Sequence, residues 1–339
     1  MSAKSNKVRV AILGCGGFAG AHARRLRDNE DAQIVALCDV KNEITQGYLD
    51  RNLDGYSPAP AQFTDPAKMY STVEPDAVFI CTPHTLHAEH AHQALDAGCH
   101  VFLEKPMVTA AEDAHALAEK VRQTGKILVV GYNTPCTPEF NYIRESIREQ
   151  RFGKLELIVG HLSQNWKRAT TGMWRQDPEL SGGGQAYDSG AHLLNSLVWS
   201  VEDDIAEVFA FIDNHETAVD INSSINVRFE SGVFASIVIG GNCPATGSHM
   251  SFIFDNGKIN TNGWNGDWLE VYDGNQKIKY PPVTGETQFP DDNFIDAILG
   301  RAEPRTSAHN GIVQSELMDA IYESARTGAP ARPKRRATA

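Results

Sequence analysis

Asp188, His192 and Lys105 are the side chains of this chain whose types and spacing best suit proton transfer. Asp188 and His192 stand four residues apart, directly after the run Gly182-Gly183-Gly184. If this segment is helical, the carboxylate and the imidazole project from one face, one turn apart. Lys105 lies in a Glu-Lys-Pro tripeptide that follows a short apolar run. These groups suit the oxidation of a secondary alcohol, which needs a proton acceptor on one side of the carbon and a hydride acceptor on the other.

We expect His192 to be the general base, because an imidazole has an unperturbed pKa of about 6.5. Lys105 would need a large downward shift of its pKa to act alone, so we expect it to hydrogen-bond the substrate oxygen and stabilise developing negative charge. Asp188 would hold the Lys105 ammonium or the His192 imidazole in place. Which of His192 and Lys105 accepts the proton stays open. So does a purely structural role, with His192 packed between domains and Asp188 complementing a helix dipole.

A glycine-rich turn near the N-terminus predicts dinucleotide binding. Residues 14–19 follow an apolar run at 8–13 and open a helical pattern, which is the context that the G-x-G-x-x-A fingerprint requires. Gly14 permits the tight turn, Gly16 lets the backbone approach a pyrophosphate, and Ala19 lets helix and strand pack closely. The candidate cofactor contacts in this turn are Gly14, Gly16, Gly17, Phe18 and Ala19.

Asp39 favours NAD over NADP as the dinucleotide. It ends the second apolar run, about 20 residues past the glycines, where a carboxylate accepts hydrogen bonds from ribose hydroxyls. The same charge would repel a 2'-phosphate, although the nearby Lys41 softens that preference. The alternative for Asp39 is a solvated loop residue or a helix cap.

Glu104 and Pro106 flank Lys105 and are expected to shape the turn around it. Pro106 biases Lys105 away from helical dihedrals and stiffens the turn. In an extended chain Glu104 points the opposite way from Lys105, so we expect it to support the cofactor edge rather than to react.

The elements that position these residues alternate through the first part of the chain. Strand-like runs are expected at 8–13, 33–38, 77–81, 100–103 and 127–130, with helical patterns at 17–28, 86–97 and 110–123. Such alternation predicts right-handed crossovers and a doubly wound parallel sheet, an α/β domain of the Rossmann type. The carboxyl ends of its strands would face the ligand crevice. We assign this domain to residues 1–132.

A second domain, residues 133–330, has a different pattern. Ile225, Val227 and Phe229 alternate with polar residues, as half-buried antiparallel strands do. A hairpin signal follows at 230–233, and the pattern of strand and turn continues at 252–257 and 268–274. Helices are expected at 139–150, 291–299 and 311–326. We therefore expect an α+β domain with a large, mostly antiparallel open sheet. Residues 331–339 are expected to form a flexible basic tail.

The bulk composition describes a globular protein without a membrane or nucleic-acid footprint. A formal charge of -12 disfavours nucleic acid and anionic membranes as partners, since both need clustered Lys and Arg. No segment approaches ~18 uninterrupted apolar residues, and the start of the chain lacks an apolar run, so we expect a cytoplasmic protein. The six cysteines form no C-x-x-C pair and are expected to be free thiols. Histidines 84, 87, 90 and 92 lack the spacing of a metal site, so no metal is expected.

Together these motifs resemble the family of glucose-fructose oxidoreductase, inositol dehydrogenase and the rhizopine-catabolism protein MocA. The likeness covers nearly the whole chain, and its most specific parts are the Glu-Lys-Pro tripeptide and the Asp188/His192 pair. The resemblance implies that Lys105, Asp188 and His192 form the catalytic group. The positions that it places along the dinucleotide, besides the glycine turn and Asp39, are Thr82, Pro83, His87, Glu104 and Lys105. It also implies a homodimer or homotetramer through the open face of the second sheet.

One departure leaves the substrate open. Many members carry an arginine-rich segment after the sixth strand, whereas this chain reads Gly131-Tyr-Asn-Thr-Pro-Cys-Thr-Pro138. We expect a hydroxylated ring as substrate, which Trp166 and Trp174 would help to bind. The competing interpretation is that both tryptophans only pack at a domain interface. The candidate substrate contacts are Lys105, Asn133, Gln164, Trp174, Arg175, Asp188 and His192, with Trp166 and Lys167 nearby.

Three functions compete at this point. The first is an NAD-dependent dehydrogenase or reductase acting on a secondary hydroxyl of a cyclic polyol, sugar or glycoside. The second is a glycoside-cleaving enzyme that oxidises its substrate transiently on tightly held NAD. The third is a non-catalytic sugar or nucleotide sensor, against which the retention of Lys105, Asp188 and His192 argues.

Overall fold

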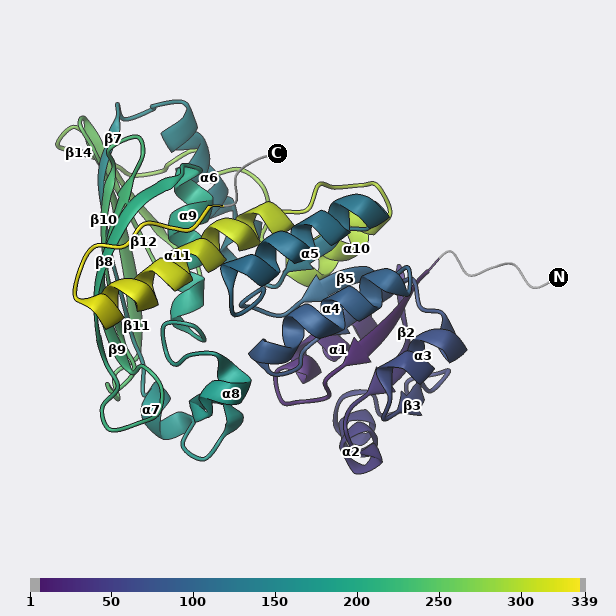
Figure 1. Ribbon diagram of the computed structural model, residues 1–339. Coiled ribbons are helices and arrows are strands. Elements are labelled where there is room, and N and C mark those ends of the chain that lie inside the picture. Colours follow the sequence, from purple (N-terminus) through teal and green to yellow (C-terminus); the bar gives the residue numbers. More distant parts are fainter. Residues whose placement is uncertain (1–6, 336–339) are drawn as a thin grey trace. The chain divides into compact units, whose positions relative to one another are not determined.

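The computed structural model describes residues 7–335 and divides them into two compact units (Figure 1). The first unit contains residues 7–107, 116–131 and 289–308, and the second contains 108–115, 132–288 and 309–335. No helix within these residues is long and apolar enough to cross a membrane.

The first unit is built on a six-stranded parallel sheet with the order β3-β2-β1-β4-β5-β6. Its strands are β1 (Val8–Leu13), β2 (Ala32–Cys38), β3 (Ala61–Phe63), β4 (Ala77–Ile80), β5 (His100–Leu103) and β6 (Leu128–Val130). The helices are α1 (Ala19–Asp28), α2 (Asn42–Asn52), α3 (Pro66–Val73), α4 (His87–Asp96), α10 (Pro290–Ile298) and, from residue 116 on, α5 (Ala111–Thr124). The near-continuous apolar runs are buried as a parallel sheet requires, so the predicted doubly wound fold is confirmed.

Residues 289–308 pack with the first sheet, although the sequence pattern assigned them to the second domain. α10 contacts α1, β5 and β6. Phe294 is fully buried and meets the rings of Phe79 and Phe102 edge-on. An apolar helix face shows that a helix must be covered but not by which sheet, so the pattern alone could not make this assignment.

The second unit carries an eight-stranded sheet with the order β14-β13-β12-β11-β7-β10-β9-β8. Its strands are β7 (Leu155–Ser163), β8 (Ile205–Asp213), β9 (Asn222–Phe229), β10 (Phe234–Gly240), β11 (Gly247–Phe254), β12 (Gly257–Thr261), β13 (Leu269–Asp273) and β14 (Gln276–Ile278). Its helices are α6 (Pro138–Arg148), α7 (Trp166–Ala169), α8 (Pro178–Ser181), α9 (Gly190–Val201) and α11 (Ala308–Thr327). Only the β7–β10 pair is parallel among the described strands of this sheet, so the predicted mostly antiparallel sheet is confirmed.

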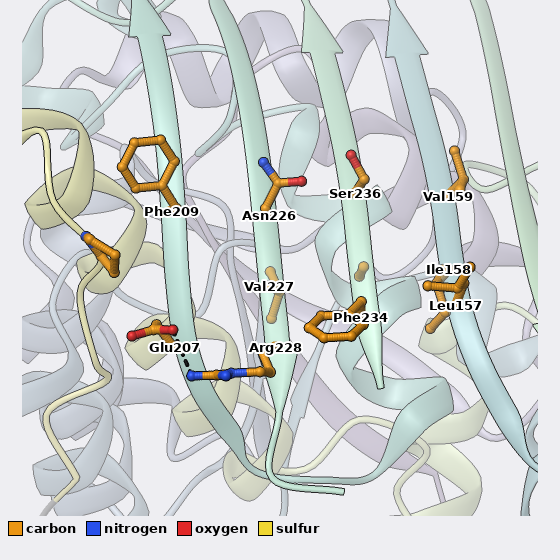
Figure 2. A pocket seen from close by; sticks show the side chains of 12 residues that line it. Leu157, Ile158, Val159, Glu207, Phe209, Asn226, Val227, Arg228, Phe234 and Ser236 are labelled. Carbon is orange, nitrogen blue, oxygen red and sulfur yellow. Dashed lines mark hydrogen bonds and ion pairs between the residues drawn. The ribbon is translucent and has the colours of Figure 1, made fainter. Parts of the chain in front are cut away.

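The two faces of this sheet differ in burial. Along β9, Ile225, Val227 and Phe229 are buried in the core that α6, α9 and α11 cover, as predicted. The other face is open, and Figure 2 shows Leu157, Val159, Phe209 and Phe234 along it, with an ion pair between Glu207 and Arg228. Five large apolar side chains of this open face are at least 43% exposed, namely Leu157, Val159, Phe211, Phe234 and Val238.

The beginning of the predicted C-terminal tail is ordered against the second sheet, which corrects the expectation for residues 331–335. Ala331 exchanges two backbone hydrogen bonds of 2.8 Å with Val208 and is 8% exposed. Arg335 donates to the carbonyl of Ile205. The remaining tail residues 336–339, like residues 1–6 at the start, lie outside the described range.

Candidate active site

The glycine turn joins β1 to α1 in a geometry that suits a phosphate group. Gly14 has a φ of 90°, and an added Cβ would lie 2.7 Å from the backbone carbon of Cys81, so only glycine fits there. At Gly16 and Gly17 an added Cβ would meet no protein atom, which leaves the turn open. α1 begins at Ala19 without a side-chain cap, and its N-terminus carries the positive end of the helix dipole, although Gly20 and Ala21 already donate to the carbonyls of Gly17 and Phe18. The turn fits a pyrophosphate on these observations.

Asp39 lies at the carboxyl end of β2 and is bonded to the glycine turn. Its Oδ2 accepts a hydrogen bond of 2.7 Å from the backbone N–H of Cys15, and its Oδ1 accepts one from Val40. The side chain is half-buried. A carboxylate held in this way stands at the position where the sequence predicted a ribose contact.

His87 connects the ends of β4 and β5. Its imidazole is fully buried, with Nε2 2.9 Å from the carbonyl oxygen of Thr82 and Nδ1 2.8 Å from that of Pro106. Burial lowers the pKa of His87, although the two carbonyls partly offset this. His87 thus stabilises the loop that begins with Thr82 and Pro83, and its own contact with a dinucleotide remains a prediction. His90, another of the four histidines, lies 3.0 Å from the Thr82 hydroxyl.

Glu104 and Lys105 directly follow β5. Glu104 is 8% exposed, and its Oε1 lies 2.9 Å from Nε2 of His22, a helix α1 residue that the sequence did not single out. Its Oε2 accepts from the backbone N–H of Lys105 at 3.3 Å. Lys105 itself is half-buried. The Gly131 backbone passes so close that an added Cβ would lie 2.9 Å from Glu104 Oε1.

In the second unit a buried carboxylate fixes the turn that leads to Asp188. Asp220 is 2% exposed, and its two oxygens accept from the backbone N–H groups of Gly184 at 2.6 Å and Ala186 at 2.8 Å. The Tyr322 hydroxyl also donates to it. Helix α9 begins at Gly190, so Asp188 lies in the preceding turn. Asp188 and His192 therefore do not lie on one continuous helix, which the expectation of a shared helix face required.

Asp188 is 5% exposed and accepts two hydrogen bonds on Oδ2. The indole of Trp166 donates at 2.8 Å and Nε of Arg175 donates at 3.1 Å. The Arg175 guanidinium also lies 4.5 Å from the ring centre of Trp174. Asp188, Arg175, Trp166 and Trp174 therefore form one cluster in the second unit. Within it, the Trp166 indole is a hydrogen-bond donor to the Asp188 carboxylate.

His192 lies in the first turn of α9 and is 6% exposed. Its ring is 4.3 Å from that of Trp264 and meets Tyr132 edge-on at 5.8 Å. Neither aromatic neighbour was predicted, because both are far from His192 in the sequence and belong to no motif. The predicted Asn133 is half-buried.

Two further predicted pocket residues have other partners. Gln164 accepts from the Gln185 amide at 3.1 Å, and Lys167 donates to the carbonyl of His215. Contact of either side chain with substrate stays a prediction.

Comparison with known proteins identifies the family. Residues 8–132 match an oxidoreductase family with an NAD-binding Rossmann fold, and residues 140–260 match the GFO/IDH/MocA C-terminal domain. The chain belongs to the GFO/IDH/MocA oxidoreductase family. Its first domain is therefore an NAD-binding Rossmann domain, and the resemblance stated from the sequence is confirmed.

Relatives cover almost the whole chain. A D-glucoside 3-dehydrogenase of Escherichia coli is 25% identical, over 96% of this chain and 97% of that protein. The crystal structure of an aldose-aldose oxidoreductase from Caulobacter crescentus has a TM-score of 0.83 at 22% identity, covering 96% of this chain and 99% of that one. The WlbA dehydrogenase from Bordetella pertussis, solved with NADH and UDP-GlcNAcA, has a TM-score of 0.83 at 21% identity, with coverages of 97% and 100%.

Proposed function

We propose that this oxidoreductase transfers a hydride between nicotinamide and a secondary hydroxyl of a cyclic polyol, sugar or glycoside. The observation that carries the proposal is the buried Asp188 cluster, in which the carboxylate is held by Trp166 and Arg175 four residues before the imidazole of His192. A fixed carboxylate, together with an imidazole that contacts two aromatic rings, suits recognition and deprotonation of a hydroxylated ring. The name of the D-glucoside 3-dehydrogenase relative supports the same substrate class.

We assign each candidate residue a separate role in hydride and proton transfer. Bound NAD supplies the hydride acceptor or donor. Lys105 donates a hydrogen bond to the reacting oxygen and stabilises negative charge on it. His192 takes the hydroxyl proton in oxidation and returns it in reduction, with Asp188 favouring the imidazolium. Asn133, Gln164, Trp174 and Arg175 would bind the remaining ring hydroxyls.

The first test supplies the enzyme with inositols, aldoses, glycosides and anhydrosugars, each with NAD and, in parallel, with NADP. Turnover is measured from the absorbance of the reduced dinucleotide. We expect steady turnover with at least one of these compounds. Lys105→Ala and His192→Ala should each lose at least about 100-fold in turnover, the usual size of a general acid or base contribution, while keeping NADH affinity. His309→Ala changes an exposed histidine and serves as the matched control. Retained activity in His192→Ala would refute its assignment as the base.

Asp39 supports NAD as the preferred dinucleotide. Because its carboxylate is fixed by the Cys15 N–H, it would place negative charge at the ribose, where a 2'-phosphate is repelled. Asp39→Ser should lower the ratio of NAD to NADP turnover at least about tenfold. An unchanged ratio would remove Asp39 from cofactor selection.

We further propose that a second copy of the chain covers the open face of the second sheet, giving a homodimer or homotetramer. The exposed apolar side chains of this face, among them Leu157 and Phe234, form a patch that a monomer would leave in water (Figure 2). Glu207 and Arg228 on this face form an ion pair with each other within one chain, so their charges do not oppose contact with a second copy.

The six cysteines are free thiols, which supports a cytoplasmic location.

A further inference from the structure

A buried histidine in the first unit stands between two carboxylates. His22 on α1 is 2% exposed, with Nε2 2.9 Å from Glu104 Oε1 and Nδ1 2.6 Å from Asp291 Oδ1. A neutral imidazole has one donor and one acceptor nitrogen, whereas both nitrogens here face acceptors. The geometry is satisfied when the ring is an imidazolium that donates to both carboxylates.

Charge balance in this cluster leads to the same protonation state. Arg25 donates to Asp291 Oδ2 at 2.9 Å, and its guanidinium lies 3.9 Å from the ring centre of Phe289. Two carboxylates and two cations sum to zero, so the cluster is neutral only when His22 carries a proton. Burial alone would lower the pKa of His22, but the charges and hydrogen bonds of Asp291 and Glu104 raise it to about 9.

Aromatic rings surround the imidazole and limit its movement. Phe18, Phe79 and Phe102 lie 5.0 to 5.5 Å from it between ring centres. Such apolar walls strengthen the ionic bonds inside them and make an unpaired charge costly. The Glu104 carboxylate is therefore fixed on its Oε1 side by His22 and on its Oε2 side by the Lys105 N–H.

We propose that His22 is a positioning residue for the cofactor edge, an imidazolium that is held by Asp291 and in turn fixes the Glu104 carboxylate beside Lys105. The inference rests on the proposed function, in which Glu104 and Lys105 line the nicotinamide dinucleotide. His22 itself is enclosed and acts only through Glu104.

The first measurement needs no cofactor. In protein with isotope-labelled histidine, the ring nitrogen shifts of His22 should show both nitrogens protonated at pH 7.5, with a titration midpoint about 9. The titratable groups that act on the ring are Asp291 and Glu104, and these two carboxylates also interact with Arg25 and Cys81. A neutral ring at pH 7.5 would overturn the inference.

The second measurement is NADH affinity by fluorescence titration. Asparagine at position 22 can reach Asp291 but is too short for Glu104, whereas the glutamine amide can take the place of Nε2. We expect His22→Asn to weaken NADH binding about tenfold and His22→Gln by less than about threefold. On a Glu104→Gln background the effect of His22→Asn should disappear, because the path through Glu104 is already broken.

Leu26→Ala is the control for general destabilisation, because Leu26 is buried one turn further along α1 and its aliphatic side chain cannot hydrogen-bond Glu104. It should lower the melting temperature without weakening NADH binding. If His22→Asn binds NADH like the wild type, or loses as much on the Glu104→Gln background, His22 has only a structural role and the inference falls. If the wild type binds neither NADH nor NADPH, the proposed function fails as well.

Discussion

Replacing Asp220 by asparagine tests how the turn before Asp188 is held in place. The Asp220 carboxylate accepts from Gly184 N–H, Ala186 N–H and the Tyr322 hydroxyl, and it is 2% exposed. Asparagine removes the charge and turns an NH₂ group toward one of these donors. One buried donor left unpaired costs about 1–3 kcal/mol, and two charge-assisted bonds that become neutral lose about 1 kcal/mol each. We therefore expect Asp220→Asn to lower the free energy of unfolding by about 3–5 kcal/mol.

The assay is urea unfolding at pH 7.5, with Tyr322→Phe as the matched control. This control removes one hydroxyl and leaves both backbone bonds to Asp220, so it should cost about 1–2 kcal/mol. Because the turn carries Asp188, kcat/KM in Asp220→Asn should fall at least about tenfold at a temperature where the protein stays folded. NADH affinity, which depends on the first unit, should not change. A loss of stability in Asp220→Asn no larger than in Tyr322→Phe would refute the reasoning.

Three further predictions concern other parts of the chain. Gly14→Ala should lower the free energy of unfolding by about 2–4 kcal/mol in a urea titration, since the backbone there has a φ of 90° and no room for a Cβ. Burial alone would raise the pKa of Glu202, but hydrogen bonds from Arg144 and Arg148 lower it to about 2. These bonds therefore stabilise the fold fully above about pH 4.5, and the stabilisation is lost as the pH falls through 2. At neutral pH the wild type should have a free energy of unfolding about 1 kcal/mol above that of Glu202→Gln, after solvent screening. Unfolding curves measured in acid should show no such difference. Phe234→Glu should convert the proposed oligomer to a monomer in light scattering, and an unchanged mass would exclude this face as the interface.

The parallel sheet was predictable because each central strand is a short apolar run followed by a turn and a helix. Burial on both faces leaves that run almost uninterrupted, as in β4, where all four residues are buried. β3 was missed because three residues, Ala61–Phe63, are too few for a pattern, and an edge strand stays partly exposed. The antiparallel strands were recognised where alternation was strict, as along β9.

The partners of the candidate site residues were not predictable from spacing. His22 lies in the first turn of the amphipathic helix α1, and its partner Asp291 follows 269 residues later. Asp220 likewise fixes a turn that begins 36 residues before it. Both contacts depend on how distant elements pack, which periodicity does not encode. The sequence signal for such a contact is a polar residue on the apolar face of a helix, as His22 is in α1. A buried histidine needs hydrogen-bond partners for its ring nitrogens.

The hydrogen bonds of the two acidic site residues also bear on which group handles the proton. Glu104 is already bonded to His22 and to the Lys105 N–H, and Asp188 is already bonded to Trp166 and Arg175. A carboxylate that gave up such donors to accept a proton would leave them unpaired in a buried site, at about 1–3 kcal/mol each. We therefore expect both carboxylates to act as fixed charges and the nitrogen bases to exchange the proton. Asp188→Asn should therefore lower kcat without removing the ionisation from the pH profile of kcat, whereas His192→Ala should remove that ionisation.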